Sequence, residues 1–179
     1  MSILLIGLSE ELTEALVGRL INEGDEVRVL EDSDDHAESW RMLGAHIAQG
    51  NIWDADLIER AAQNVRTIVV GDHHTHDPTE LMDEVVTGGG FATKDMRIVL
   101  VGQDLEGPAL RRLRESPLAY VALGVATRRS LFGRRRAPAP ATLAEAIDAA
   151  DDLAGEPRLE LDLGDEQAWA ELKLPLPED

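Results

Sequence analysis

The sequence contains no cysteine, which excludes disulfide bonds, thiol nucleophiles and thiolate metal ligands. Positive charge is also scarce: 17 basic residues stand against 35 acidic ones, and Lys94 and Lys173 are the only lysines. The formal net charge of −18 repels phosphate backbones and anionic lipid headgroups. We therefore expect no nucleic-acid or membrane partner, and expect instead another protein or a second copy of this chain.

Long hydrophobic runs are absent as well. The segment from Met1 to Ile6 lacks a basic region, and its apolar run is too short for a secretion signal. No stretch approaches the ~20 apolar residues that a helix needs to cross a bilayer. Together with the lack of cysteine, this predicts a cytoplasmic protein.

The residues that are present alternate between strand and helix patterns. The predicted strands cover residues 3–6, 26–30, 45–48, 67–70, 97–101 and 119–125, with a candidate edge strand at 158–163. The first predicted helix begins after Ser9, and the second runs through Trp40 to Leu43. Three further helices are predicted at residues 56–63, 77–86 and 108–115. The last predicted helix starts at a capping box formed by Thr142 and Glu145. This alternation predicts an α/β fold with a doubly wound, mostly parallel, Rossmann-like sheet of about six strands and a small C-terminal extension.

The length suits one domain of ordinary size. We expect residues 1–130 to form the Rossmann-like core and residues 131–141, rich in arginine and proline, to form a linker. Residues 142–179 then supply a helix and an edge strand that complete the same domain. Gly88 to Gly90 are predicted to connect the preceding helix to the strand at 97–101.

The order of features over residues 3–70 resembles the start of atypical short-chain dehydrogenase/reductases, particularly the NmrA-like branch. The resemblance rests on an apolar strand ending at Gly7, on the segments at 20–27 and 43–45, and on Gly50 to Asp54, which matches that family's Gly-Asp-Leu-x-Asp segment. It implies a dinucleotide-binding fold with the cofactor at the carboxyl ends of the strands. The candidate cofactor-binding residues are Gly7, Leu8, Ser9, Glu31, Asp32, Asn51, Ile52 and Gly71.

The glycine motif of that family is degenerate here. In the spacing Gly-x-x-Gly-x-x-Gly, the second and third glycines are replaced by Glu10 and Thr13. In the alternative spacing Gly-x-Gly-x-x-Gly, Gly7 is again the only one of the three glycines that is present. Glu10 and Glu11 place negative charge where phosphates would bind, although acidic residues in a first helical turn also stabilise the helix dipole. We expect either NAD, whose ribose hydroxyls Glu31 or Asp32 could hold, or no cofactor.

The catalytic pair of the related oxidoreductases is also missing. They use Tyr-x-x-x-Lys, in which the lysine lowers the tyrosine pKa for proton transfer. Tyr120 is the only tyrosine, and Gly124 stands where the lysine is required. Tyr120 is therefore predicted to be a strand residue at the edge of the core, and no catalytic residue is assigned.

Three of the five histidines, His73, His74 and His76, directly follow the fourth predicted strand. Imidazoles with flanking carboxylates can hold zinc or another divalent metal if three or four ligands converge. Alternatively, the segment is a polar loop leading into a helix capped by Asp77. These histidines are the candidate metal ligands.

These observations favour a degenerate Rossmann-fold protein without catalytic activity, serving as a nucleotide-sensing, regulatory or assembly module. The first alternative is an NAD(P)-dependent oxidoreductase or epimerase-like enzyme with unfamiliar catalytic residues. The second is a metal-dependent hydrolase that uses the three clustered histidines.

Overall fold

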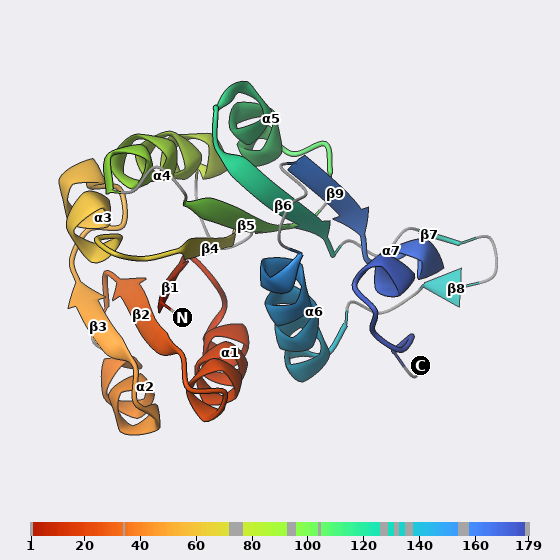
Figure 1. The fold of residues 1–179 in the computed structure, drawn as a ribbon, viewed down its shortest axis with the longest axis horizontal. Coiled ribbons are helices and arrows are strands. Elements are labelled where there is room, and N and C mark those ends of the chain that lie inside the picture. Colours follow the sequence, from red (N-terminus) through yellow and green to blue (C-terminus); the bar gives the residue numbers. More distant parts are fainter. Residues whose placement is uncertain are drawn as a thin grey trace.

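The computed structural model describes residues 2–33, 35–71, 77–92, 96–103, 105–125, 129–130, 133–134, 138–153 and 158–177. In this part of the chain, a seven-stranded sheet has the order β3-β2-β1-β4-β5-β6-β9, and every neighbouring pair is parallel (Figure 1). Its strands are β1 (Ser2–Ile6), β2 (Glu26–Glu31), β3 (His46–Gln49), β4 (Thr67–Gly71), β5 (Arg97–Gly102), β6 (Ala119–Gly124) and β9 (Arg158–Asp162). This confirms the predicted doubly wound parallel sheet, and the candidate edge strand is a full member of it.

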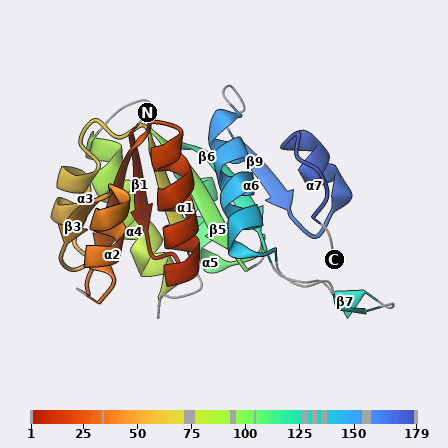
Figure 2. The same cartoon turned by 90° about the horizontal axis from the view of Figure 1, so that it is seen from below.

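Helices cover both faces of the sheet. They are α1 (Glu10–Asn22), α2 (Ala37–Leu43), α3 (Ala55–Ala61), α4 (Pro78–Ala92), α5 (Pro108–Glu115), α6 (Pro140–Asp152) and α7 (Glu166–Glu171). One face packs against α1, α2, α6 and α7, and the other against α3, α4 and α5 (Figure 2). Because successive strand residues point to opposite faces, Ile3 and Leu5 join the first core and Leu4 and Ile6 join the second.

Short polar side chains fix the starts of several helices. The Ser9 hydroxyl accepts a hydrogen bond from the Leu12 N–H at 3.3 Å, which caps α1. The Asp77 carboxylate accepts the N–H groups of Thr79 and Glu80, and Pro78 is the first residue of α4. Both caps are the ones that the sequence predicts.

The predicted end of α4 is wrong. The helix continues past Val86 and through Gly88 to Gly90, ending at Ala92. A Cβ atom on Gly88 would lie 2.5 Å from the carbonyl oxygen of Ala55, so α3 and α4 are in direct backbone contact there. The glycines therefore allow close helix packing instead of breaking the helix.

The C-terminal segment contains one helix whose start differs from the prediction and further elements that the sequence pattern did not reveal. α6 begins at Pro140 rather than at a Thr142 cap, because proline is well suited to the first turn of a helix. The short helix α7 follows β9, and its Trp169 is buried and donates its indole N–H to the carbonyl of Leu163 at 2.9 Å. A small hairpin of β7 (Arg129–Ser130) and β8 (Gly133–Arg134) projects from the body of the molecule (Figure 2). None of the helices in the described ranges has the length and apolar character to span a membrane.

Candidate functional site

The strand order changes direction at β1, which places a candidate site beside it. The chain proceeds from β1 outward to β2 and β3, then returns to form β4 on the other side of β1. Ligands of open α/β sheets bind outside the carboxyl ends of the strands at such a switch point. Since β1, β2, β3 and β4 are parallel, the residues that end them meet at one edge, which we call the carboxyl edge.

Two glycines at the carboxyl edge are in close contact. Gly7, which follows β1, has a φ of 64°, a backbone conformation that glycine adopts at little cost. A Cβ atom on Gly71, the last residue of β4, would lie 2.3 Å from the carbonyl oxygen of Gly7. The structure therefore brings these two predicted site residues together. The positive φ explains the glycine at Gly7, and the close backbone contact explains the one at Gly71.

The N-terminus of α1 carries carboxylates instead of further glycines. Glu10 is its first residue, and the Oε1 atom of Glu10 lies 3.0 Å from Nδ1 of His36, at the N-cap of α2. The next residue, Glu11, is exposed. The Leu12 N–H is already occupied by Ser9. This helix end thus lacks the bare backbone that a pyrophosphate group approaches in a dinucleotide site.

Glu31 lies where a ribose-binding carboxylate would be expected. It is the last residue of β2 and is half-buried. Its Oε1 atom accepts the N–H groups of Asp32 at 3.2 Å and Ser33 at 3.4 Å. Burial and a hydrogen bond with the Asp32 side chain raise the pKa of Glu31. A half-buried carboxyl group fixed in this way can serve as an acceptor for ribose hydroxyls.

The remaining predicted cofactor-binding residues have structural roles in the turns. The Asn51 side chain accepts the Trp53 N–H at 3.0 Å, a local turn contact. Ile52 packs on the core beneath α3 and α4, and Leu8 packs on the core beneath α1. Their positions beside the carboxyl edge suit a binding site, but these contacts account for them without a ligand.

The predicted metal ligands His73, His74 and His76 lie outside the described residues. Among the residues that the structure does describe, no three metal-ligating side chains converge. A different histidine, His36, reaches the carboxyl edge, and the sequence interpretation missed it. Its position just after the acidic turn and at the start of a predicted helix is the signal that could have identified it.

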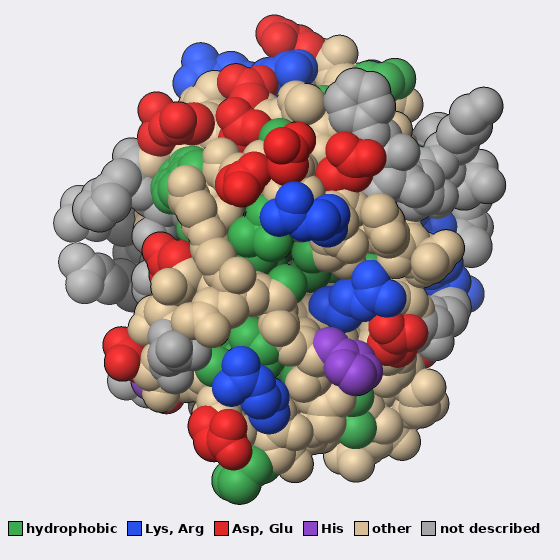
Figure 3. All heavy atoms as spheres, turned by 90° about the vertical axis from the view of Figure 1, so that its left-hand side faces the viewer, with side chains coloured by type: hydrophobic (Ala, Val, Ile, Leu, Met, Phe, Trp, Pro, Cys, Tyr) green, Lys and Arg blue, Asp and Glu red, His purple; other side chains and the backbone are tan. Residues whose placement is uncertain are grey.

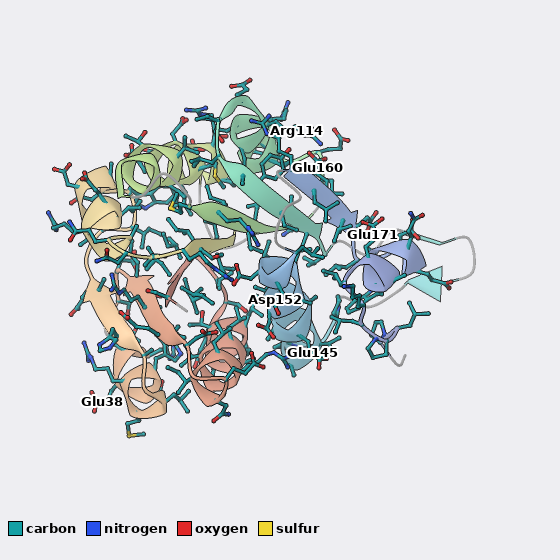
Figure 4. All side chains as sticks on the ribbon, in the orientation of Figure 1. Glu38, Arg114, Glu145, Asp152, Glu160 and Glu171 are labelled. Carbon is teal, nitrogen blue, oxygen red and sulfur yellow. The ribbon has the colours of Figure 1, made fainter. Side chains whose placement is uncertain are left out.

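Tyr120 lies at the opposite end of the sheet, confirming its expected place as a strand residue. It is the second residue of β6, far along the strand from Gly124 at the carboxyl edge. Its hydroxyl donates to Oε1 of Glu160 at 2.9 Å. Glu160 also accepts both Nε and Nη2 of Arg114, at 2.8 and 2.6 Å, and Figure 4 shows Arg114 of α5 beside Glu160 of β9. Tyr120 therefore belongs to a stabilising network.

Electrostatics strengthen this network. The Arg114 guanidinium lowers the pKa of Glu160, with a further contribution from the Tyr120 hydroxyl. Burial, together with the hydrogen bond to Glu160, raises the pKa of Tyr120. A tyrosine that moves protons in catalysis needs a lowered pKa, so the environment of Tyr120 acts in the wrong direction for that role.

The residues at the carboxyl edge fit only half of a dinucleotide. Glu31 suits a ribose diol, because a carboxylate accepts hydrogen bonds from both hydroxyl groups. Glu10 and Glu11 do not suit a pyrophosphate, since both carry negative charge at the end of α1 that would face it.

Comparisons with known proteins agree with this fold. No protein-family model matches the chain, and no curated protein sequence matches it significantly. Among solved structures, the anaerobillin reductase ChuY of Escherichia coli O157:H7 superposes with a TM-score of 0.70 at 14% identity, covering 89% of this chain and 94% of its own. A nucleoside-diphosphate-sugar epimerase of Staphylococcus aureus gives a TM-score of 0.71 at 15% identity, covering 90% of this chain and 70% of its own.

The triphenylmethane reductase of Citrobacter sp., solved with NADP(H), gives a TM-score of 0.69 at 15% identity over 90% of this chain and 69% of its own. At such low identity the likeness concerns the fold. It agrees with the resemblance seen over residues 3–70 and covers 90% of the chain. The fold of this chain is that of the Rossmann-type NAD(P)-binding reductases and epimerases.

Proposed function

We propose that this chain is a non-catalytic Rossmann-fold module that binds a ribose-bearing ligand at its carboxyl edge. Its biological role is regulation, or assembly with another protein or a second copy of itself. The binding part of the proposal rests on Glu31, and the non-catalytic part rests on Tyr120.

Glu31 supports binding because of where it lies and how it is held. As the last residue of β2, it stands at the carboxyl edge, next to the strand that leads into α1. Two backbone N–H groups fix one of its oxygens, so the carboxyl group is positioned before any ligand arrives. A ligand phosphorylated at the ribose 2′ position would meet the charges of Glu31 and Asp32, which favours an unmodified diol.

The position of Tyr120 is the observation that carries the non-catalytic assignment. The only tyrosine of the chain is held at the amino end of the sheet by Glu160, away from the edge where a cofactor would lie. Of the two lysines, Lys173 follows α7, which comes after the edge strand β9. Tyr120 therefore cannot take the part of the catalytic tyrosine in the tyrosine–lysine pair of the related oxidoreductases.

The second candidate is an NAD(P)-dependent reductase that uses other groups. It is favoured by the structural likeness to two reductases, one of which matches this chain over 94% of its own length. In such an enzyme, positioning of the cofactor against its substrate would supply most of the rate enhancement.

Calorimetric titration of the full chain with adenosine and 2′-deoxyadenosine tests the ribose site. Adenosine is expected to bind about tenfold more tightly, because only it presents both hydroxyl groups to Glu31. Glu31→Gln should remove this preference, whereas Glu38→Gln, an exposed position on α2, should keep it. Equal affinity for the two nucleosides in the natural chain would contradict the proposal.

The reductase alternative needs a separate assay. The chain is incubated with NADH or NADPH and a panel of electron acceptors, including anaerobillin and triphenylmethane dyes. Our proposal predicts no acceptor-dependent loss of the reduced cofactor above the protein-free rate. Turnover that Tyr120→Phe leaves unchanged would establish the reductase alternative and overturn the non-catalytic assignment.

A further inference from the structure

We infer that Glu10, held by His36, excludes phosphate from the carboxyl edge, so that the ligand is a nucleoside with an uncharged or cationic 5′ group. This inference rests on the proposed ribose site and adds the chemical class of its ligand. It makes Glu10 a specificity-determining residue. The cofactor class that the fold implies, a dinucleotide, is thereby disfavoured.

The geometry fixes the Glu10 carboxylate between two helix ends. Glu10 begins α1 and His36 precedes α2, and these helices follow β1 and β2, the strands that flank the candidate site. The 3.0 Å contact between Oε1 of Glu10 and Nδ1 of His36 therefore bridges the two turns across which a ribose and its 5′ phosphate would lie. The bridge therefore holds a carboxylate at the N-terminus of α1, the helix end that a phosphate would approach.

His36 is itself held in place, although the bridge lies at the surface, where the His36 side chain is 42% and the Glu10 side chain 52% exposed. Its ring packs on Trp40 with centroids 5.9 Å apart, and Trp40 is only 2% exposed. Ser39 donates its hydroxyl to the carbonyl of His36 at 2.7 Å. A histidine anchored at both its ring and its backbone presents Nδ1 to Glu10 in a defined direction.

The charges around the site also disfavour a phosphate group. The positive end of the α1 dipole already faces Glu10 and Glu11, so it offers little further attraction to an anion. Glu31 and Asp32 add negative charge on the other side of the site. A phosphate group would meet carboxylates from both turns, whereas a hydroxyl would meet hydrogen-bond acceptors and an ammonium group would meet opposite charge.

A matched ligand series isolates the 5′ group: 5′-amino-5′-deoxyadenosine, adenosine and AMP, each titrated calorimetrically into the full chain. We expect the amino compound to bind most tightly and AMP at least about tenfold more weakly than adenosine. Glu10→Gln should improve AMP binding about tenfold and leave adenosine binding nearly unchanged. Glu14→Gln, an exposed position one turn further along α1, is the control and should change neither.

The outcomes separate this inference from the proposed function. If AMP binds the natural chain as tightly as adenosine does, the inference fails while the ribose site stands. If Glu10→Gln does not improve AMP binding, Glu10 is not the excluding group and the inference fails as well. If none of the three compounds binds, the ribose site itself is wrong. A thermal melt of each variant checks folding, because a purely structural role for Glu10 would lower the melting temperature without changing the order of the ligands.

Discussion

Single side chains at the amino end of the sheet hold segments together that are distant in sequence. Tyr120 of β6, Glu160 of β9 and Arg114 of α5 share one network, in which Glu160 accepts from both partners. Arg158 lies over the Tyr120 ring, 5.9 Å from its centroid. The network therefore fixes the edge strand β9 to the rest of the sheet.

Tyr120→Phe removes one hydrogen bond to Glu160 and keeps the ring. We expect a loss of about 1 kcal/mol in the free energy of unfolding and no change in adenosine binding. Urea denaturation and calorimetry measure the two quantities. A loss of binding with unchanged stability would show that Tyr120 belongs to the ligand site after all.

The pH dependence of stability follows from the same network. The pKa of Glu160 is lowered in the folded state, so its stabilisation is present above the pKa of the unfolded chain and is lost as pH falls through the lower folded value. The pKa of Tyr120 is raised, so its contribution is present below about pH 10 and declines as pH rises further. Urea denaturation at a series of pH values measures this effect. Below about pH 4 the natural chain should lose the stability that Glu160 contributes, and the Glu160→Gln variant should not show this loss.

Asp151 is a second residue whose importance only the structure reveals. Its side chain is 5% exposed, accepts from Arg66 and from the Thr67 hydroxyl, and lies 3.9 Å from Arg97. Its backbone carbonyl accepts from Arg97 as well. These contacts attach the end of α6 to the starts of β4 and β5.

Asp151→Ala should destabilise the fold by about 2 kcal/mol, because it leaves the buried Thr67 hydroxyl and the partly exposed Arg66 and Arg97 without their acceptor. Its neighbour Asp152 is exposed, and Asp152→Ala should cost less than about 0.5 kcal/mol. Figure 4 shows Asp152 on α6. Urea denaturation of both variants gives the comparison, and equal midpoints would show that the Asp151 contacts add no net stability.

At the scale of elements, the contact between α3 and α4 shows how packing can override local preference. Glycine is unfavourable in the interior of a helix, so the pattern at Gly88 to Gly90 predicts a loop between a helix and the next strand. In the structure each of the three has a different environment within α4. A Cβ on Gly88 would meet backbone, one on Gly89 would lie 2.4 Å from the flexible end of Met96, and one on Gly90 would meet nothing within 4 Å.

These environments predict opposite effects of the same substitution. Gly88→Ala should destabilise the chain by about 1–3 kcal/mol, because α3 and α4 must separate. Gly90→Ala should stabilise it by about 0.5–1 kcal/mol, because alanine favours the helix and meets no obstacle. Thermal and urea denaturation of both variants decide the matter, and destabilisation by Gly90→Ala would mean that α4 ends before that residue.

At the scale of the molecule, the net charge of −18 is the dominant feature. The side that forms the left of Figure 1, where β3, α2 and α3 lie, shows basic and acidic side chains intermixed with hydrophobic ones (Figure 3). Several arginines are committed to internal contacts, such as Arg28, which donates to the carbonyls of Ala61 and Gln63.

Salt should stabilise the whole chain. Screening weakens the repulsion between surface carboxylates more than it weakens the buried contacts of Asp151. We expect the melting temperature to rise by at least a few degrees between roughly 0.01 and 0.5 M NaCl. The triple variant Glu11→Gln, Glu14→Gln, Glu80→Gln, which changes exposed positions only, should rise less. A melting temperature that falls with salt would show that attractive pairs outweigh the repulsion.

The sequence alone determined the parallel sheet. Continuous apolar runs such as residues 3–6 and 67–70 are typical of strands that are buried on both faces, and strands of this kind occur mainly in parallel sheets covered by helices. It also located Gly7 and Glu31 at the ends of strands, since strand ends follow from where the apolar runs stop. Both features depend on residues that are near one another in the chain.

Only the tertiary structure decided which distant residues meet. The pairing of Glu10 with His36, the attachment of Asp151 to Arg66, and the contact of Gly88 with Ala55 each join separate elements. Local periodicity carries no information about such contacts, because they depend on how helices are placed on the sheet. The same physical reason explains why the sequence located Glu10 at the start of a helix, while its contact with His36 required the structure.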